Sequence, residues 1–264
     1  FWPMTTGCQI LIGDGLRGTD EVEVPVPNGE YCKTAKIGRA IMDADVFISL
    51  THFKGHESTG FGGAIKNIAM GCGSRRGKME MHSAAKPLVD QEKCRGCRRC
   101  MGFCAMNAIS MDDGKAEISE SACVGCGRCV SACPFDAIEP IYDESPEIFN
   151  AKIVEYAMGA VKGKECFHIS FICDVSPHCD CHPMNDAPLI PDLGIAASHD
   201  PVAIDQACAD LCNAAPLMPN GCLAGRDTHG DLFATMHPAT RWQDAVAEGE
   251  RMGLGTRAYA LRRI

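Results

Sequence analysis

Two closely similar cysteine runs lie near the middle of this chain of 264 residues. In each run three cysteines stand three residues apart, and a fourth follows four residues after the third. The eight positions are Cys94, Cys97, Cys100 and Cys104 in the first run, and Cys123, Cys126, Cys129 and Cys133 in the second. This spacing is typical of bacterial ferredoxins, in which three thiolates of one run bind a [4Fe-4S] cluster and the fourth cysteine binds the other cluster.

The crossed pattern assigns four thiolates to each of two clusters. Cluster 1 is expected on Cys94, Cys97, Cys100 and Cys133, and cluster 2 on Cys123, Cys126, Cys129 and Cys104. A zinc ribbon is the alternative, but zinc sites usually pair two Cys-x-x-Cys knuckles over a longer gap. A third cysteine at the same short spacing has no use in a tetrahedral zinc site. We therefore predict two [4Fe-4S] clusters as cofactors.

A second group of chemically active side chains follows two expected strands outside the cysteine runs. These side chains are His52, Lys54 and His56 after one strand, and Asp174, His178, Cys179, Cys181 and His182 after another. Carboxyl ends of parallel strands meet at one edge of a sheet, so we expect these residues to share one rim. Imidazole and thiolate ligands suit a transition metal.

The sequence therefore predicts an additional Zn or Fe ion at this rim. Cys179, Cys181 and His182 are the first choice of ligands, with His52 or His56 supplementing them. The alternative for any single histidine is a hydrogen-bonded structural residue.

A glycine-rich segment at the same rim predicts a site for an anion. Gly62 and Gly63 let the backbone come close to a ligand, and a helix starting near Gly63 would point free N–H groups at it. Lys54 and Lys66 flank this segment and suit the carboxylate or phosphate of a small anionic substrate. Solvated lysines are the alternative. The segment matches neither the dinucleotide fingerprint, because Ile65 replaces its last glycine, nor a P-loop.

Composition restricts the compartment and the partners. Eighteen cysteines would indicate a disulfide scaffold only in a small secreted protein, and eight are already assigned to clusters, so we expect a reducing, anaerobic cytoplasm. No apolar run reaches the roughly 20 residues that span a bilayer, which predicts no membrane association. The net charge is −9 and no basic stripe is present, which argues against nucleic acid as a partner.

A redox partner protein is the expected macromolecular partner. Arg95, Arg98 and Arg99 lie among the cysteines of the first run. They could dock an acidic electron carrier or raise the potential of the first cluster, with solvated surface charge as the alternative.

The pattern around the cysteine runs predicts an α/β fold with a mostly parallel sheet and helices. It is interrupted by a small α+β ferredoxin-like insert with two [4Fe-4S] clusters, giving the segments 1–86, 87–142 and 143–264. Strands are expected at 8–13, 45–50, 167–172, 193–197 and 258–264. Helices are expected at 36–42, 63–71, 145–163, 202–214 and 240–252, and a loop at 74–82.

Several segments together with the twin cysteine runs carry a family resemblance. They are 12–18, 52–56, 62–67, 78–82, 174–182 and 200–205. Over nearly its whole length the chain resembles the uncharacterised Fe-S centre proteins of domain-of-unknown-function family 362. The resemblance implies an α/β domain interrupted by a two-cluster ferredoxin module, and relatives with a further amino-terminal α/β portion. The abrupt start at Phe1 agrees with this, and we expect such a portion to precede it.

The sequence thus predicts an iron-sulfur redox protein. Its two clusters would relay electrons to a ligand or metal site on the α/β rim, which makes an oxidoreductase one reading. The alternative is a non-catalytic electron carrier, or a maturation factor that hands metal, a cluster or electrons to another enzyme. The resemblance supplies no reaction that would decide between them.

Overall fold

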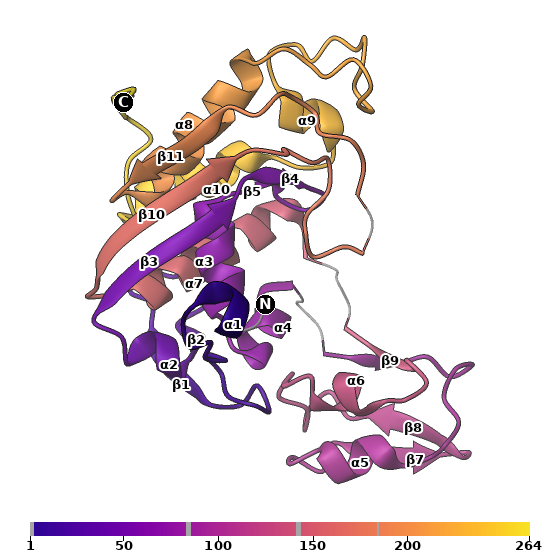
Figure 1. The fold of residues 1–264 in the computed structure, drawn as a ribbon. Helices are drawn as coiled ribbons and strands as arrows, with labels where there is room; N and C mark the ends of the chain where they lie inside the picture. Colours follow the sequence, from indigo (N-terminus) through magenta and orange to yellow (C-terminus); the bar gives the residue numbers. More distant parts are fainter. Residues whose placement is uncertain (1–2, 83–85, 141–143, 184) are drawn as a thin grey trace.

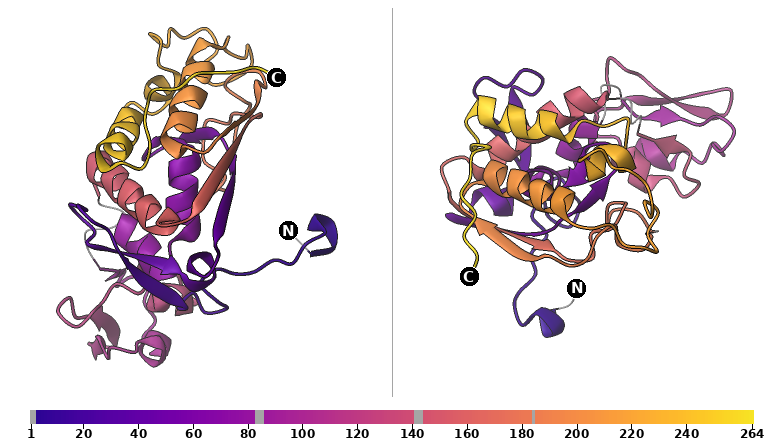
Figure 2. Two further views of the ribbon diagram at one scale, coloured as in Figure 1. Left: turned by 90° about the vertical axis from the view of Figure 1, so that its left-hand side faces the viewer. Right: turned by 90° about the horizontal axis from the view of Figure 1, so that it is seen from above.

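The larger part of the fold packs helices against one face of a three-stranded sheet (Figure 1). The structure, a computed structural model, describes residues 3–82, 86–140, 144–183 and 185–264. The sheet has the order β11-β10-β3, formed by Gly194–Ser198, Glu165–Ile172 and Val46–His52. Helices α3 (Ala64–Cys72), α7 (Pro146–Val161), α8 (Pro201–Ala214) and α10 (Trp242–Met252) lie on one side of it, as the left view of Figure 2 shows. The described residues form a mixed α/β fold with small sheets and no closed barrel.

The expected mostly parallel sheet is not confirmed. Strand β3 pairs parallel with β10, but β10 pairs antiparallel with β11, and the four two-stranded sheets among the described residues are all antiparallel. A parallel neighbour needs a long crossover, which is usually a helix. The described residues of the link between β10 and β11 form no helix, so the chain turns back on itself.

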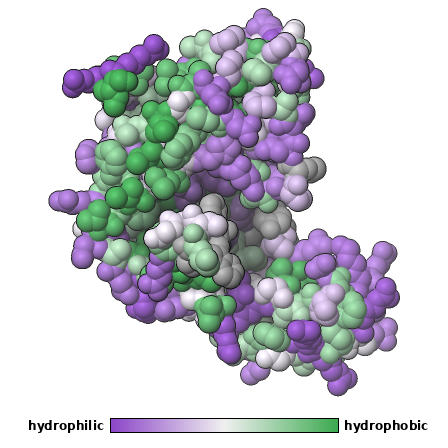
Figure 3. All heavy atoms as spheres, in the orientation of Figure 1, coloured by the Kyte–Doolittle hydropathy of each residue, from purple (hydrophilic) through white to green (hydrophobic). Residues whose placement is uncertain are grey.

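The other face of the sheet presents apolar side chains to the surface. Val46, Ile48 and Leu50 of β3 are 57%, 60% and 63% exposed, and Phe171 and Ile195 stand on the same face of β10 and β11. Figure 3 shows the resulting hydrophobic area over these strands. A sheet in an α/β fold is commonly covered on both faces, whereas this one is covered on one face by the described residues.

Three expected elements differ from the structure. Residues 8–13 form no strand, and Leu11 is 69% exposed, because no strand among the described residues pairs with this apolar run. Residues 258–264 likewise form no strand. The basic segment expected as a loop is helix α4 (Arg75–His82), which begins where the Ser74 hydroxyl accepts a hydrogen bond from the Gly77 N–H at 3.1 Å.

The amino-terminal part packs a hairpin and its loop onto α7. Strands β1 (Glu21–Pro25) and β2 (Thr34–Gly38) pair antiparallel, and short helices α1 (Pro3–Thr6) and α2 (Arg39–Met42) flank them in the sequence. The buried carboxylate of Glu155 on α7 accepts hydrogen bonds from three consecutive backbone N–H groups in the hairpin loop. These groups belong to Glu30, Tyr31 and Cys32, at 2.5, 3.0 and 2.6 Å.

The segment with the two cysteine runs has its own small core, apart from the main sheet (Figure 1). Its sheets pair β6 (Leu88–Val89) with β9 (Ile138–Glu139) and β7 (Ile109–Asp112) with β8 (Lys115–Ile118). Helices α5 (Arg99–Phe103) and α6 (Arg128–Ala132) each follow a cysteine loop. The division of the chain at 86/87 and 142/143 stays a prediction, and the second boundary lies outside the described residues.

Helix α4 connects this segment to the rest of the molecule. The Arg75 guanidinium donates a hydrogen bond to the Ser131 hydroxyl at 2.9 Å. A Cβ atom at Gly127 would lie 3.2 Å from Cγ of Met79, so the second cysteine loop packs directly on this helix.

The hairpin of β4 (Lys54–His56) and β5 (Gly60–Gly62) is anchored by aromatic side chains. Phe53 and Phe61 contact Phe233 of α9 (Leu232–Met236), and Phe61 also contacts Trp242 of α10, with ring centroids 5.4–5.7 Å apart. No helix of the described residues is long and apolar enough to span a membrane.

Replacing Glu155 tests the anchor between the hairpin loop and α7. Glu155→Ala leaves three backbone N–H groups without their acceptor, so we expect it to lower the free energy of unfolding by about 2–4 kcal/mol. Faster amide hydrogen exchange at residues 30–32 would accompany the loss. The control Glu165→Ala removes an exposed glutamate and should stay within about 0.5 kcal/mol of the wild type. Unchanged exchange at residues 30–32 would contradict the assignment.

Candidate functional site

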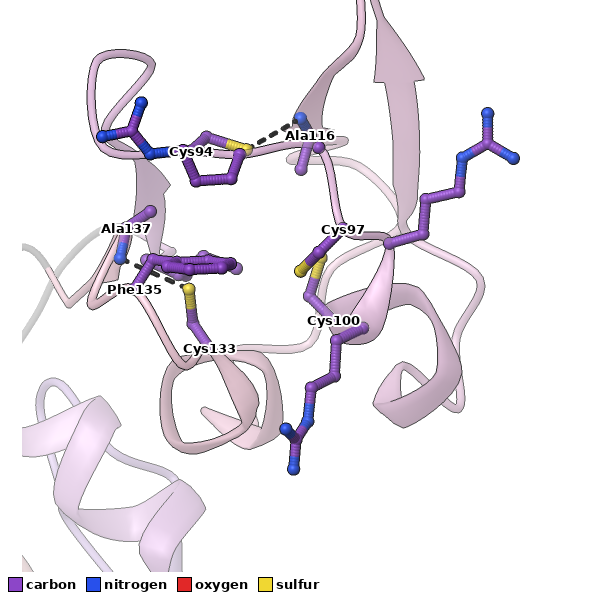
Figure 4. A pocket seen from close by; sticks show the side chains of 12 residues that line it. Cys94, Cys97, Cys100, Ala116, Cys133, Phe135 and Ala137 are labelled. Atoms are coloured by element: carbon purple, nitrogen blue, oxygen red, sulfur yellow. Dashed lines mark hydrogen bonds between the residues drawn. The ribbon is translucent and has the colours of Figure 1, made fainter.

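Four cysteines from both runs surround one pocket, which we call cluster site 1 (Figure 4). They are Cys94, Cys97, Cys100 and Cys133. The rest of the lining combines the apolar side chains of Ala116, Phe135, Ala137 and Ile138 with three arginines and Gly96. The structure thus places the last cysteine of the second run beside the first three cysteines of the first.

The backbone around cluster site 1 directs N–H groups at the sulfur atoms. The N–H groups of Ala116 and Ala137 donate to Sγ of Cys94 and Cys133, at 3.5 and 3.3 Å. The bond from Ala116 is the main cause that lowers the pKa of the Cys94 thiol. The tight loop needs a glycine at position 96, where φ is 67° and a Cβ atom would lie 2.2 Å from the carbonyl oxygen of Gly114.

Cluster site 2 repeats this arrangement with the other four cysteines. Its pocket is lined by Cys104, Cys123, Cys126 and Cys129, together with Ile109, Ile118 and Val124. The N–H groups of Ala108 and Gly125 donate to Sγ of Cys104 and Cys123, at 3.3 and 3.4 Å. Burial, followed by the charges of Cys126 and Cys123, raises the pKa of the Cys129 thiol to about 11.

Both sites have the chemistry that a metal or iron-sulfur centre requires. Closely spaced thiolates repel one another, and a cationic core removes that cost. Apolar walls and N–H groups aimed at sulfur are features that tune iron-sulfur clusters. The two cysteine groups are therefore compatible with metal or Fe-S binding.

A third group of ligand-type side chains, here called the rim site, lies where β4 meets the loop after β10. One ligand atom each from His56, Cys179 and Cys181 lie within 4.8 Å of one another. Glu57, Cys181 and His182 form a second, overlapping group within the same distance. The Glu57 carboxylate and the His182 Nε2 atom are 2.7 Å apart. These groups are compatible with a metal ion.

The two expected histidine ligands at the start of the rim are held in different ways. His52 belongs to neither group, because its Nδ1 lies 2.9 Å from the Asp180 carboxylate and its Nε2 lies 2.9 Å from the carbonyl oxygen of Cys173. It positions the loop that carries the two cysteines.

His56 lies in the first group, but its ring is already committed on one side. Its Nδ1 accepts hydrogen bonds from the N–H groups of Ser58 and Thr59, at 3.0 and 3.3 Å. The ring proton of the neutral imidazole is therefore on Nε2. Burial and the charge of Lys66 lower the pKa of His56 to about 3, which keeps the ring neutral. His56 can offer a lone pair to a metal only by giving up these bonds, so the remaining candidate ligands are Cys179, Cys181 and the hydrogen-bonded pair of Glu57 and His182.

The two lysines that we expected to bind an anion point to different partners. Lys66 donates a hydrogen bond to Sγ of Cys179 at 3.3 Å. Lys54 is buried, donates to the carbonyl oxygen of His52 at 2.8 Å, and lies 3.4 Å from the Asp180 carboxylate. A Cβ atom at Gly62 would lie 3.2 Å from Cε of Lys54, so this glycine makes room for the lysine stem.

The helix N-terminus that we expected to face a ligand anion faces a carboxylate of the chain itself. Asp205 of α8 accepts hydrogen bonds from the N–H groups of Ala64 and Ile65, at 2.6 and 2.9 Å. A Cβ atom at Gly63 would lie 2.3 Å from Oδ1 of Asp205. The sequence did not predict Asp205 as the anion at this helix, although the segment 200–205 is one of those that carry the family resemblance.

A comparison with known protein families gives a match over most of the chain. Residues 1–210 match the family described as Domain of unknown function (DUF362). The chain belongs to this family. The match spans both cluster sites, the rim site and Asp205, and it ends before α9 and α10. No curated protein matches the chain.

Asp205 predicts a pH dependence of stability. Burial raises its pKa to about 7, well above the ordinary value of about 3.9. The folded state therefore binds the proton more tightly than the unfolded state, and stability falls as the pH rises from about 4 through about 7. We expect the melting temperature of the wild type to fall relative to that of Asp205→Asn between pH 5.5 and 8, measured anaerobically. Parallel profiles of the two proteins would contradict this explanation.

Proposed function

We propose that the protein is an iron-sulfur redox protein that relays electrons through two [4Fe-4S] clusters to the rim site. The main support is that eight cysteines gather into two groups of four, each group drawing three thiols from one run and one from the other. Each cluster, when bound, would supply one-electron transfer. The ferredoxin-like character of the segment 87–142 is part of this proposal.

The residues of the chain have defined roles in this proposal. The eight thiolates bind the irons, and the backbone N–H groups aimed at Cys94, Cys104, Cys123 and Cys133 stabilise negative charge on sulfur. Apolar side chains such as Phe135 and Ile138 in site 1 exclude water from that cluster. Hydrogen bonding and solvent exclusion are the means by which a protein sets a cluster potential.

Helix α4 supports the route from cluster site 2 to the rim site. Met79 and Arg75 pack on the cysteine loop at Gly127. At the far end of the helix, burial, followed by the charge of Lys66, lowers the pKa of His82 to about 4. A helix of eight residues spans only about 12 Å.

At the rim we propose a Zn or Fe ion bound by Cys179, Cys181 and His182, with Glu57 beside them. Lys66 would offset part of the thiolate charge, since its Nζ lies 3.3 Å from Sγ of Cys179. A redox partner protein in a reducing cytoplasm completes the proposal. An electron carrier without chemistry at the rim is the second candidate, and the rim metal decides between them.

Iron analysis tests the two cluster sites. Anaerobically reconstituted wild type should hold about eight iron and about eight sulfide ions per chain. Cys97→Ser and Cys126→Ser should each lose about half of the iron, because each removes one ligand from a different site. Cys222→Ser removes an exposed cysteine outside both sites and should leave the iron content unchanged. A single zinc ion per cysteine group, without sulfide, would contradict the proposal.

The rim site is tested by counting metal ions beyond the cluster iron. Wild type purified anaerobically should contain about one further zinc or iron ion per chain, because two groups of three ligand-type side chains overlap there at Cys181. The double variant Cys179→Ser/Cys181→Ser should lose that ion and keep its cluster iron, measured by plasma mass spectrometry.

The matched control is Cys173→Ser, which changes a cysteine in the same loop outside both ligand groups. It should retain the rim metal. If wild type holds no metal beyond the clusters, the electron-carrier function replaces the relay to the rim.

A further inference from the structure

The two cluster sites have different surroundings. Cluster site 2 faces the rest of the molecule, where Gly127 packs on Met79 and Ser131 bonds to Arg75. Cluster site 1 carries Arg95, Arg98 and Arg99 in its lining, and all three arginines are exposed. Only one of the two sites therefore presents a concentrated positive charge to solvent.

These three arginines are not used to hold the local structure together. Among the described residues, no ion pair or side-chain hydrogen bond engages Arg95, Arg98 or Arg99. The neighbouring lysines differ. Lys93 pairs with Asp90 and Glu139, and Lys115 donates to the carbonyl oxygens of Gln91 and Cys94.

The charge of the whole chain makes this patch more selective. The protein has a formal net charge of −9, so the chain as a whole repels an acidic partner at long range. Three unpaired guanidinium groups within five residues provide a local field of the opposite sign. Such a field raises the rate of productive encounters by about 10- to 1,000-fold and is weakened by salt.

We propose that Arg95, Arg98 and Arg99 form the docking surface for an acidic one-electron carrier protein, whose electrons enter the chain at cluster site 1. The carrier is a small reduced redox protein with carboxylates around its own cofactor. In each encounter the carrier loses one electron and the cluster of site 1 gains it. The inference rests on the proposed function, because it requires a cluster in site 1.

The arrangement gives the two sites a fixed order along the route. Cluster site 1 has the exposed arginines in its lining, and cluster site 2 abuts α4 at Gly127. A carrier docked on the arginines is therefore beside cluster site 1, and cluster site 2 lies on the side of helix α4.

The test compares two triple variants of the cluster-loaded protein. Arg95→Gln/Arg98→Gln/Arg99→Gln removes the docking surface, and Arg226→Gln/Arg262→Gln/Arg263→Gln removes the same charge from three exposed arginines elsewhere. Stopped-flow reduction by a reduced acidic ferredoxin at low salt is the readout. We expect the first variant to react at least about 10-fold more slowly and to lose most of the salt dependence. The second variant should match the wild type.

A small zwitterionic viologen radical serves as the second electron donor. It needs no docking surface, so it should reduce all three proteins at the same rate. If the first variant is also slowed with the viologen, the arginines tune the cluster itself and the docking proposal falls. It also falls if the first variant keeps the ferredoxin rate of the wild type. A wild type without cluster absorbance would instead overturn the proposed function on which the inference rests.

Discussion

Mutual repulsion of thiolates is the constraint on which this structure depends. Each cysteine group brings four sulfur ligands around one small pocket, and burial, followed by the charges of Cys126 and Cys123, raises the pKa of the Cys129 thiol. The chain meets this cost with short loops, left-handed residues such as Gly96 and Gly125, and backbone N–H groups aimed at sulfur. A cationic metal core would offset the remainder. The segment therefore has its own compact core around the cysteines, and one helix, α4, joins its second loop to the larger fold.

The sequence predicted best those features that depend on local spacing. The two groups of four cysteines follow from the repeat. The helices expected at 145–163 and 202–214 are present as α7 and α8, with Ser145 and Asp200 as their caps. Features that depend on distant partners were missed. An apolar run at 8–13 does not reveal whether a neighbouring strand exists, and a basic segment at 75–82 does not reveal the contacts that keep it helical. The direction of β11 depended on a link that contains no crossover helix among its described residues.

The rim site shows the same limit at the level of single atoms. The sequence placed five ligand-type residues at one rim, and three of them, His56, Cys179 and Cys181, lie within 4.8 Å of one another. It could not show that backbone N–H groups occupy Nδ1 of His56, or that His52 holds Asp180. Nor could it show that Glu57 stands beside His182. The donors ready for a metal are set by hydrogen bonds that form only when β4 meets the loop after β10.

The charged side chains differ in whether the fold supplies partners for them. At α3 the carboxylate of Asp205 satisfies the helix N-terminus from within, which leaves no room there for a ligand anion. Lys54 and Lys66 are likewise engaged with acceptors inside the fold. By contrast, Arg95, Arg98 and Arg99 are exposed and have no such acceptor among the described residues. Because buried charges need partners and exposed charges do not, free positive charge at the surface beside cluster site 1 is available to a partner, whereas the lysines at the rim stabilise the site that they line.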